Sequence, residues 1–231
     1  MGVGGAVEWP GDGRQYGHGF LTGRTTLGDV VGFSTACFTS GDFPVAALAC
    51  KAYGGNAVEL ACAGSTRTEV LAHAVEQLRA HGLRPSVLLR DGCTRPIDVD
   101  APLIVPADQP LLDIPKLLTF RNTAEPELLD QALAAHPAAS LCLDASLAFA
   151  TGGHLLLRAL AGDHADRLSQ VNVGTVDTEP SLVELVSAAF DAAGRAVPVI
   201  IERPGPVWEE GLAEEVARLR ALARRFLTPY R

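Results

Sequence analysis

The sequence predicts a single-domain α/β protein with the architecture of a (β/α)8 TIM barrel. From Asp29 onward, short apolar or β-branched runs alternate with longer segments of helical periodicity, and eight such runs occur. This alternation is typical of a parallel sheet whose strands are joined by helices. The chain has 231 residues, of which 48% are hydrophobic, so it is long enough to bury one large core.

The apolar runs supply the predicted strands. The run from Ser140 to Asp144 is continuously apolar until it ends in a single carboxylate, so we expect a buried strand that delivers Asp144 to a loop. An open doubly wound sheet is the alternative architecture, but the glycine fingerprint of a dinucleotide-binding fold is absent. The predicted strands are 30–35, 57–61, 85–90, 102–105, 117–122, 140–144, 170–174 and 197–202.

The segments between these strands carry helix signals. Pro44 opens the first helix, and Thr66 with Glu69 forms a predicted capping box ahead of the second. Pro126 lies in the first turn of a later helix, and Gly194 ends another. The last helix has acidic residues early and arginines late, in agreement with its dipole. The predicted helices are 44–53, 66–82, 125–135, 154–160, 180–193 and 208–226.

Two segments depart from the alternation. Residues 1–27 are rich in glycine and lack periodicity, which predicts a flexible N-terminal arm ahead of a barrel domain at 28–231. The stretch from Asp91 to Asp100 is short and charged and contains glycine and proline, so we expect the helix after the third strand to be missing. An apolar patch left uncovered there would favour self-association as a homodimer.

Composition excludes several classes of function. The net charge of −8 and the pI near 5.2 leave no basic stripe for a phosphate backbone, which disfavours nucleic-acid binding. The sequence has no secretory segment and no apolar run near the roughly 20 residues that a bilayer requires. The five cysteines are single and form no CxxC pair, as expected for free thiols in a reducing compartment. We therefore expect a cytoplasmic protein that meets neither membrane nor nucleic acid and whose partner is a small-molecule substrate.

The candidate site residues follow from where the strands end. In a parallel barrel the carboxyl ends of all strands converge on one face. A helix cap is the structural alternative for Asp144, a buried salt bridge for Glu59 and a solvated helix start for His154, while a register shift of one residue would turn Arg121 outward. The polar residues at or just past the strand ends are Ser34, Glu59, Arg90, Arg121, Asn122, Asp144, His154, Asn172 and Glu202.

The stretch from Cys142 to Gly152, CLDASLAFATG, resembles the "CLDxxHAFAxG" segment of the xylose-isomerase-like TIM barrels, which include sugar phosphate isomerases and epimerases. The resemblance implies a metal held by Glu, Asp, His and Glu from the fifth to eighth strands. Asp144 and Glu202 match the second and fourth of these ligands. Arg121 stands where the resembled family has its first Glu, Asn172 where it has the metal-binding His, and Leu147 where the quoted segment has His.

The replacements predict a degraded metal site in which an arginine supplies the positive charge. Two buried carboxylates without a counter-charge are costly, so some cation is needed. We therefore expect the Arg121 guanidinium within hydrogen-bonding distance of Asp144 or Glu202. We expect no metal ligand and no cofactor, with a divalent ion such as Mn or Zn, held by loop residues, as the alternative.

The resemblance and these residues predict a sugar isomerase/epimerase-like protein: a metal-independent isomerase, epimerase or lyase acting on a small polar carbonyl or polyol. Glu59, Asp144 or Glu202 would move a proton. Arg121, with Arg90, would stabilise an enolate or bind a substrate carboxylate or phosphate. The remaining expected substrate-binding residues are Ser34, Asn122, Asn172 and His154. A non-catalytic small-molecule binding protein and a metal-dependent sugar isomerase/epimerase with atypical ligands are the two alternatives.

Overall fold

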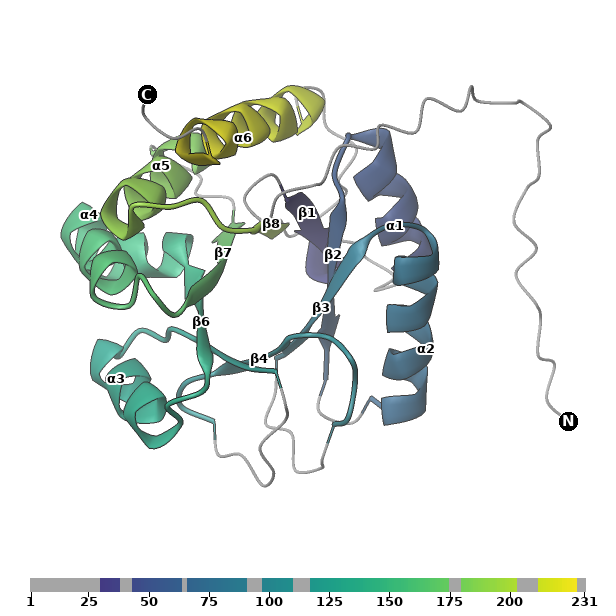
Figure 1. The fold of residues 1–231 in the computed structure, drawn as a ribbon, viewed down its shortest axis with the longest axis horizontal. Helices are drawn as coiled ribbons and strands as arrows, with labels where there is room; N and C mark the ends of the chain where they lie inside the picture. Colours follow the sequence, from purple (N-terminus) through teal and green to yellow (C-terminus); the bar gives the residue numbers. More distant parts are fainter. Residues whose placement is uncertain are drawn as a thin grey trace, which may run out of the picture.

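The structure, a computed structural model, is a closed parallel barrel (Figure 1). It describes residues 30–37, 43–63, 66–90, 97–109, 117–174, 180–202 and 212–227. The strands follow one another in sequence order, and β1 closes the barrel by pairing with β8. The predicted (β/α)8 fold is confirmed. The strands are β1 Val31–Ser34, β2 Ala57–Cys62, β3 Arg84–Leu89, β4 Leu103–Pro106, β5 Leu118–Arg121, β6 Ser140–Asp144, β7 Leu168–Gly174 and β8 Val199–Glu202.

Helices pack around the outside of the strands (Figure 1). Within the described ranges, no helix lies between β3 and β4 or between β4 and β5. The expected loss of the helix after the third strand therefore holds for residues 97–102, while 91–96 and the predicted arm 1–27 lie outside the described residues. The helices are α1 Phe43–Ala52, α2 Thr68–Ala80, α3 Pro126–Ala135, α4 Ala145–Asp163, α5 Leu182–Ala193 and α6 Leu212–Leu227, with a short 3-10 turn, η2, at Thr35–Cys37.

Helix ends explain where several elements start and stop. Ser181 and Glu184 form a capping box at the start of α5, and Gly194 ends that helix with a positive φ of 65°. The capping box predicted for Thr66 and Glu69 is wrong. Helix α2 begins at Thr68, and Arg67 occupies the N-cap position without a side-chain cap.

Helix α4 is longer than predicted. It begins at Ala145, directly after β6, because the Asp144 carboxylate accepts a hydrogen bond from the Leu147 N–H and caps the first turn. Gly152 and Gly153 have non-helical backbone angles inside it and kink the helix. The predicted segment 154–160 is therefore only the part of α4 beyond the kink.

The outer faces of β3 and β4 are buried although no described helix follows either strand, and α2, which precedes β3, packs against β3. Val87, Leu89 and Val105 are each at most 1% exposed. Ile97 and Ala101, from the connection between these strands, belong to the same core cluster. The expected apolar patch is thus not present in this part of the described chain, and self-association stays a prediction.

The side chains inside the barrel differ between its two ends. Towards the N-terminal ends of the strands, the inward-facing apolar residues form a small cluster of Val30, Ala57 and Ile200. A cavity of about 410 Å³ opens at this end, and Thr119 and Gln170 are among the side chains that line it. The polar site residues lie at the opposite end, where the strands finish.

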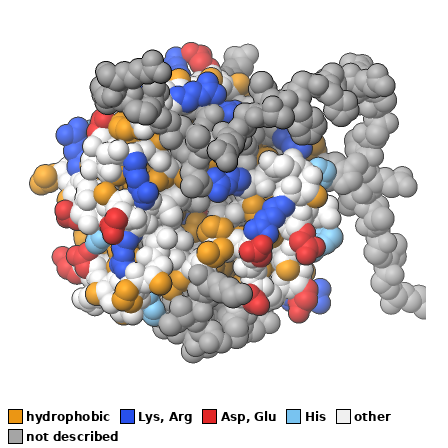
Figure 2. Space-filling view, viewed as in Figure 1, with side chains coloured by type: hydrophobic (Ala, Val, Ile, Leu, Met, Phe, Trp, Pro, Cys, Tyr) orange, Lys and Arg blue, Asp and Glu red, His pale blue; other side chains and the backbone are white. Residues whose placement is uncertain are grey.

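The surface carries both signs of charge on the face shown in Figure 2, where basic and acidic side chains are interspersed among apolar ones. Among the described residues, no helix is both long enough and apolar enough to cross a membrane. Cys50, Cys62 and Cys142 are free thiols, as the sequence predicts for these three.

Candidate functional site

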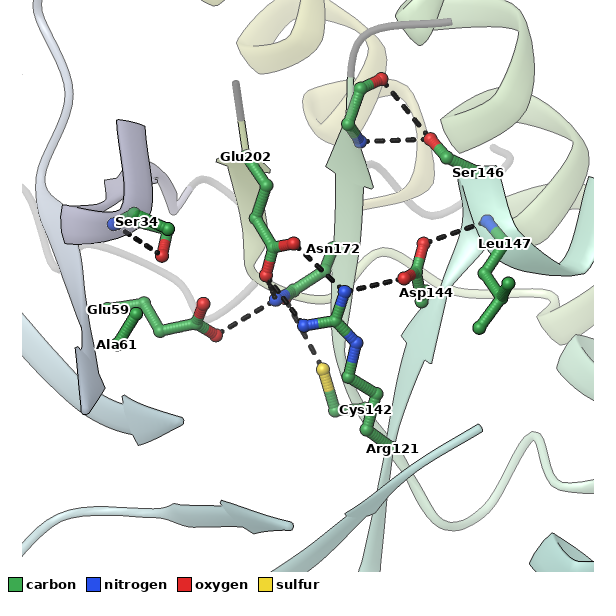
Figure 3. A network of polar contacts seen from close by, with 12 residues as sticks. Ser34, Glu59, Ala61, Arg121, Cys142, Asp144, Ser146, Leu147, Asn172 and Glu202 are labelled. Carbon is green, nitrogen blue, oxygen red and sulfur yellow. Dashed lines mark hydrogen bonds and ion pairs between the residues drawn. The ribbon is translucent and has the colours of Figure 1, made fainter. Parts of the chain in front are cut away.

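Arg121 lies at the centre of a polar network at the carboxyl ends of the strands (Figure 3). Its Nη1 donates to Glu202 Oε1 at 2.8 Å, and its Nη2 donates to Glu202 Oε2 at 2.9 Å and to Asp144 Oδ2 at 2.5 Å. The guanidinium thus forms a two-pronged pair with Glu202 and a single bond to Asp144. The ion pairs predicted for Arg121 are present, and its side chain does not turn outward.

Strand register brings these side chains together. Asp144 pairs in register with Asn172 across β6 and β7, and Gly174 pairs with Glu202 across β7 and β8. Arg121 is the last residue of β5, beside Cys142 of β6. Because parallel strands finish at the same face, residues far apart in sequence become neighbours at the barrel mouth.

Asn172 joins Glu59 to the ion pairs. Its Nδ2 donates to Glu59 Oε2 at 2.9 Å and to Glu202 Oε1 at 2.7 Å. Gln170 Nε2 donates to the same Glu59 oxygen at 2.9 Å and to Asn172 Oδ1 at 2.7 Å, and the Cys142 thiol donates to Asn172 Oδ1 at 3.3 Å. One amide group therefore bridges the two glutamates.

Sequence reasoning missed Gln170 and Cys142 as members of this network. The signal that finds them is the two-residue period of a strand, which puts alternate side chains on the same face. Gln170 lies two residues before Asn172, and Cys142 lies two residues before Asp144. Each therefore faces the barrel interior one layer below a predicted site residue.

The network shifts the pKa values of its two glutamates in opposite directions. Burial, followed by the charge of Glu202, raises the pKa of Glu59 from 4.5 to about 8, against the opposing effects of Arg121 and the Asn172 hydrogen bond. Burial also opposes ionisation of Glu202, but the charge and hydrogen bonds of Arg121 outweigh it and lower the pKa of Glu202. These shifts favour the proton on Glu59 and the charge on Glu202. The two neighbouring carboxylates outweigh burial for Arg121 and raise its pKa.

Asp144 has a structural role as well as its ion pair. Its Oδ1 caps α4 through the Leu147 N–H at 2.9 Å, so Leu147 contributes a backbone donor where the resembled family has a histidine. Asn122 Oδ1 accepts from the Asp144 N–H at 2.6 Å, and Asn122 Nδ2 donates to the Asp144 carbonyl at 3.3 Å. Asn122 therefore fixes the backbone of Asp144, and the helix-cap interpretation of Asp144 holds together with its place in the network.

The remaining predicted residues lie outside the network. Ser34 is fully buried opposite Glu59 in the register of β1 and β2, and its Oγ accepts from the Ala36 N–H. Arg90 is exposed directly after β3. His154 lies beyond the kink of α4, with its ring 4.9 Å from that of Phe149, in a groove between α4 and α5. The structure therefore places His154 away from the barrel mouth, because α4 begins earlier than predicted and carries it outward.

The residues present do not fit the divalent cation of the resembled family. The two remaining carboxylates, Asp144 and Glu202, are both bonded to the Arg121 guanidinium. In the part of the chain that the structure describes, no three His, Cys, Asp or Glu residues are grouped so that they hold a metal ion. The positive charge at this position comes from the chain itself.

Comparison with solved structures identifies the fold. The chain is similar to a sugar phosphate isomerase/epimerase from Parabacteroides distasonis, with a TM-score of 0.51 at 11% identity, over 89% of this chain and 97% of that one. This likeness shows the fold alone, a closed (β/α)8 barrel. An L-ribulose 3-epimerase is also similar, with a TM-score of 0.49 at 12% identity, over 85% of this chain and 92% of that one. No family model matches the sequence, and no curated protein matches it.

Proposed function

We propose that this barrel is a metal-independent enzyme of the sugar isomerase, epimerase or lyase kind that moves a proton on a small polar carbonyl or polyol. The observation that supports it is the Arg121 guanidinium, bonded to Asp144 and Glu202 where the resembled family binds its cation. Such reactions build negative charge on a substrate oxygen, and a preorganised positive charge stabilises it. The kind of reaction named for the similar solved structures supports the same general class.

Glu202 is the best-placed base. Its side chain is 18% exposed and that of Asp144 is 12% exposed, whereas Glu59 is fully buried. In the proposed step the C–H bond next to the substrate carbonyl breaks, the proton goes to Glu202, and the electron pair moves onto the carbonyl oxygen. A protonated Glu202 attracts Arg121 less strongly, which makes the guanidinium charge available to the new oxyanion.

The network also bears on the class of substrate. In the described chain, Asp144 Oδ2 and Glu202 Oε2 both accept hydrogen bonds from Arg121, and Asp144 Oδ2 has no other described donor, which leaves it a lone pair for a substrate hydroxyl. A substrate carboxylate or phosphate would instead compete with these two carboxylates for Arg121. We therefore favour an uncharged polyol or hydroxy-carbonyl compound over the acidic groups that the sequence also allows.

A non-catalytic binding protein is the second candidate. The observation that favours it is that Arg121 is already paired with two carboxylates and that Asp144 also caps α4. Such a network is able to hold the strand ends together without any turnover.

Solvent deuterium exchange distinguishes these candidates. Aldoses, ketoses and keto acids would be incubated with the protein in ²H₂O after treatment with a chelator, and label next to the carbonyl would be measured by NMR. We expect label with at least one compound, unchanged by added Mn, lost in Glu202→Gln and retained in Glu76→Gln, an exposed carboxyl on α2. Exchange that appears only after Mn is added would contradict metal independence, and no exchange by the folded protein would favour the binding protein.

A further inference from the structure

Glu59 is the one acid of the network that forms no ion pair with a described cation. Its side chain is completely buried in β2, whereas Arg121 pairs with Asp144 and Glu202. Both described donors to Glu59, Asn172 Nδ2 and Gln170 Nε2, are bonded to the same oxygen, Oε2. The other oxygen, Oε1, is buried, and no N–H or O–H group of the described residues donates a hydrogen bond to it.

This pattern is that of a neutral carboxylic acid. A buried carboxylate without a counter-ion is strongly disfavoured, and such a group takes up a proton instead. Two N–H donors on Oε2 mark it as the carbonyl oxygen, which leaves Oε1 as the oxygen that carries the proton. Burial and the charge of Glu202 raise the pKa of Glu59 in the same sense.

Glu202 is the direct neighbour of this acid. The two carboxyl groups share Asn172 Nδ2, at 2.9 Å from Glu59 and 2.7 Å from Glu202. Hydrogen bonding between the two side chains acts in opposite directions on them, favouring the proton on Glu59 and the charge on Glu202. Two adjacent acids in one buried site keep one proton between them because both cannot ionise cheaply.

We propose that Glu59 and Glu202 hold a single proton between them, which resides on Glu59 and so keeps Glu202 as the only ionised base of the pair. Glu59 is then a positioning residue that acts through Glu202 and does not touch the substrate. The catalytic consequence rests on the proposed function, whereas the location of the proton does not.

The surroundings of Glu59 define the pH range of the test. The charged and titratable groups around it are Glu202 on β8, Arg121 on β5, Cys142 and Asp144 on β6 and Cys62 on β2. Burial raises the pKa of Cys62 to about 11 and that of Cys142 well above its usual value, so neither thiol loses a proton near neutral pH. Proton loss from the buried network near pH 8 is therefore assigned to the Glu59–Glu202 pair.

Infrared spectroscopy of the whole chain measures this proton directly. We expect the carbonyl stretch of one protonated carboxylic acid at pH 6.5, lost as the pH rises through about 8. The band should be absent in Glu59→Gln and unchanged in Glu76→Gln. The wild-type titration alone tests the proposal if Glu59→Gln does not fold. Absence of the band from the wild type, or its persistence in folded Glu59→Gln, would overturn the proposal.

Activity supplies the second readout. If an exchanging substrate is found, we expect the wild-type rate to fall above about pH 8, where Glu59 ionises beside Glu202, and Glu59→Gln to lack this alkaline limit. If the infrared band is present but no compound exchanges deuterium, the proposed function is contradicted and the shared proton is still supported. If a substrate exchanges deuterium but the infrared band is absent, and the rate of Glu59→Gln falls above the same pH as that of the wild type, only the shared proton is contradicted.

Discussion

The interior of the barrel is filled differently at its two ends. At the C-terminal end, side chains from β2, β5, β6, β7 and β8 meet in one paired polar network. At the N-terminal end, the inward positions carry smaller side chains and leave a cavity of about 410 Å³. On β5 these two environments are only two residues apart, because Thr119 lines the cavity and Arg121 belongs to the polar network. Paired charges therefore fill the interior at one end, and smaller side chains leave part of it empty at the other.

Removing the cation should give the largest effect. Arg121→Ala leaves Asp144 and Glu202 facing each other unpaired, and we expect a loss of about 3–5 kcal/mol in the free energy of unfolding, as for other buried pairs that lose one partner. Chemical denaturation measures it. Arg90→Ala is the matched control, since Arg90 is exposed, and it should change the free energy by less than about 0.5 kcal/mol. Equal effects of the two changes would show that the network contributes little to stability.

A methyl group at Gly32 should have the next largest effect. A Cβ there would lie 2.1 Å from the Ala57 carbonyl oxygen, so β1 and β2 would have to separate. We expect Gly32→Ala to lower the free energy of unfolding by about 1–3 kcal/mol, the usual range for overpacking. Gly162→Ala, in α4, meets nothing closer than 3.5 Å and should be neutral or stabilising in the same denaturation experiment. If Gly32→Ala left the free energy of unfolding unchanged, β1 and β2 would be able to move apart at little cost.

A change of pH should act on the C-terminal end through Glu59. Its pKa is about 8 in the folded chain and near 4.5 in the unfolded one, so between these values the native state holds a proton that the unfolded state has lost. The free energy of unfolding should therefore fall as the pH rises from about 4.5 to about 8, and this fall should be smaller in Glu59→Gln. Denaturation at several pH values checks the sign, and a rise of stability over this range that depends on Glu59 would contradict it.

The smallest effect should come from a polar residue at the other end. Thr119 lines the cavity, and no hydrogen bond of its side chain occurs among the described residues, so Thr119→Val removes no pairing. We expect a change within about 0.5 kcal/mol in the free energy of unfolding. Compared with Arg121→Ala, two positions along the same strand, this result would locate the energetic importance of polar groups at the barrel mouth. A large loss on Thr119→Val would reverse that conclusion.

The sequence predicts strands better than it predicts helix starts. Short apolar runs between glycine and proline locate the strands within about two residues, and the motif resemblance led to the prediction that Arg121 pairs with Asp144 or Glu202, which the structure confirms. The position of His154 could not be foreseen, because nothing in the small residues after Asp144 indicates that a helix begins at once and kinks at Gly152. Gln170 looks like an ordinary strand residue until the register sets it beneath Asn172.

The closed barrel gives the Cys142 thiol a use as a kinetic reporter. Its Sγ is fully buried against Asn172, and burial keeps its pKa well above the usual value, so alkylating reagents meet neither an accessible atom nor a thiolate in the native state. Cys142 faces the barrel interior, where it packs with Leu88 and Ile104, so a reagent reaches it only when the packing of this interior opens. With the other cysteines replaced by serine, the alkylation rate of Cys142 should report how often the barrel opens without unfolding.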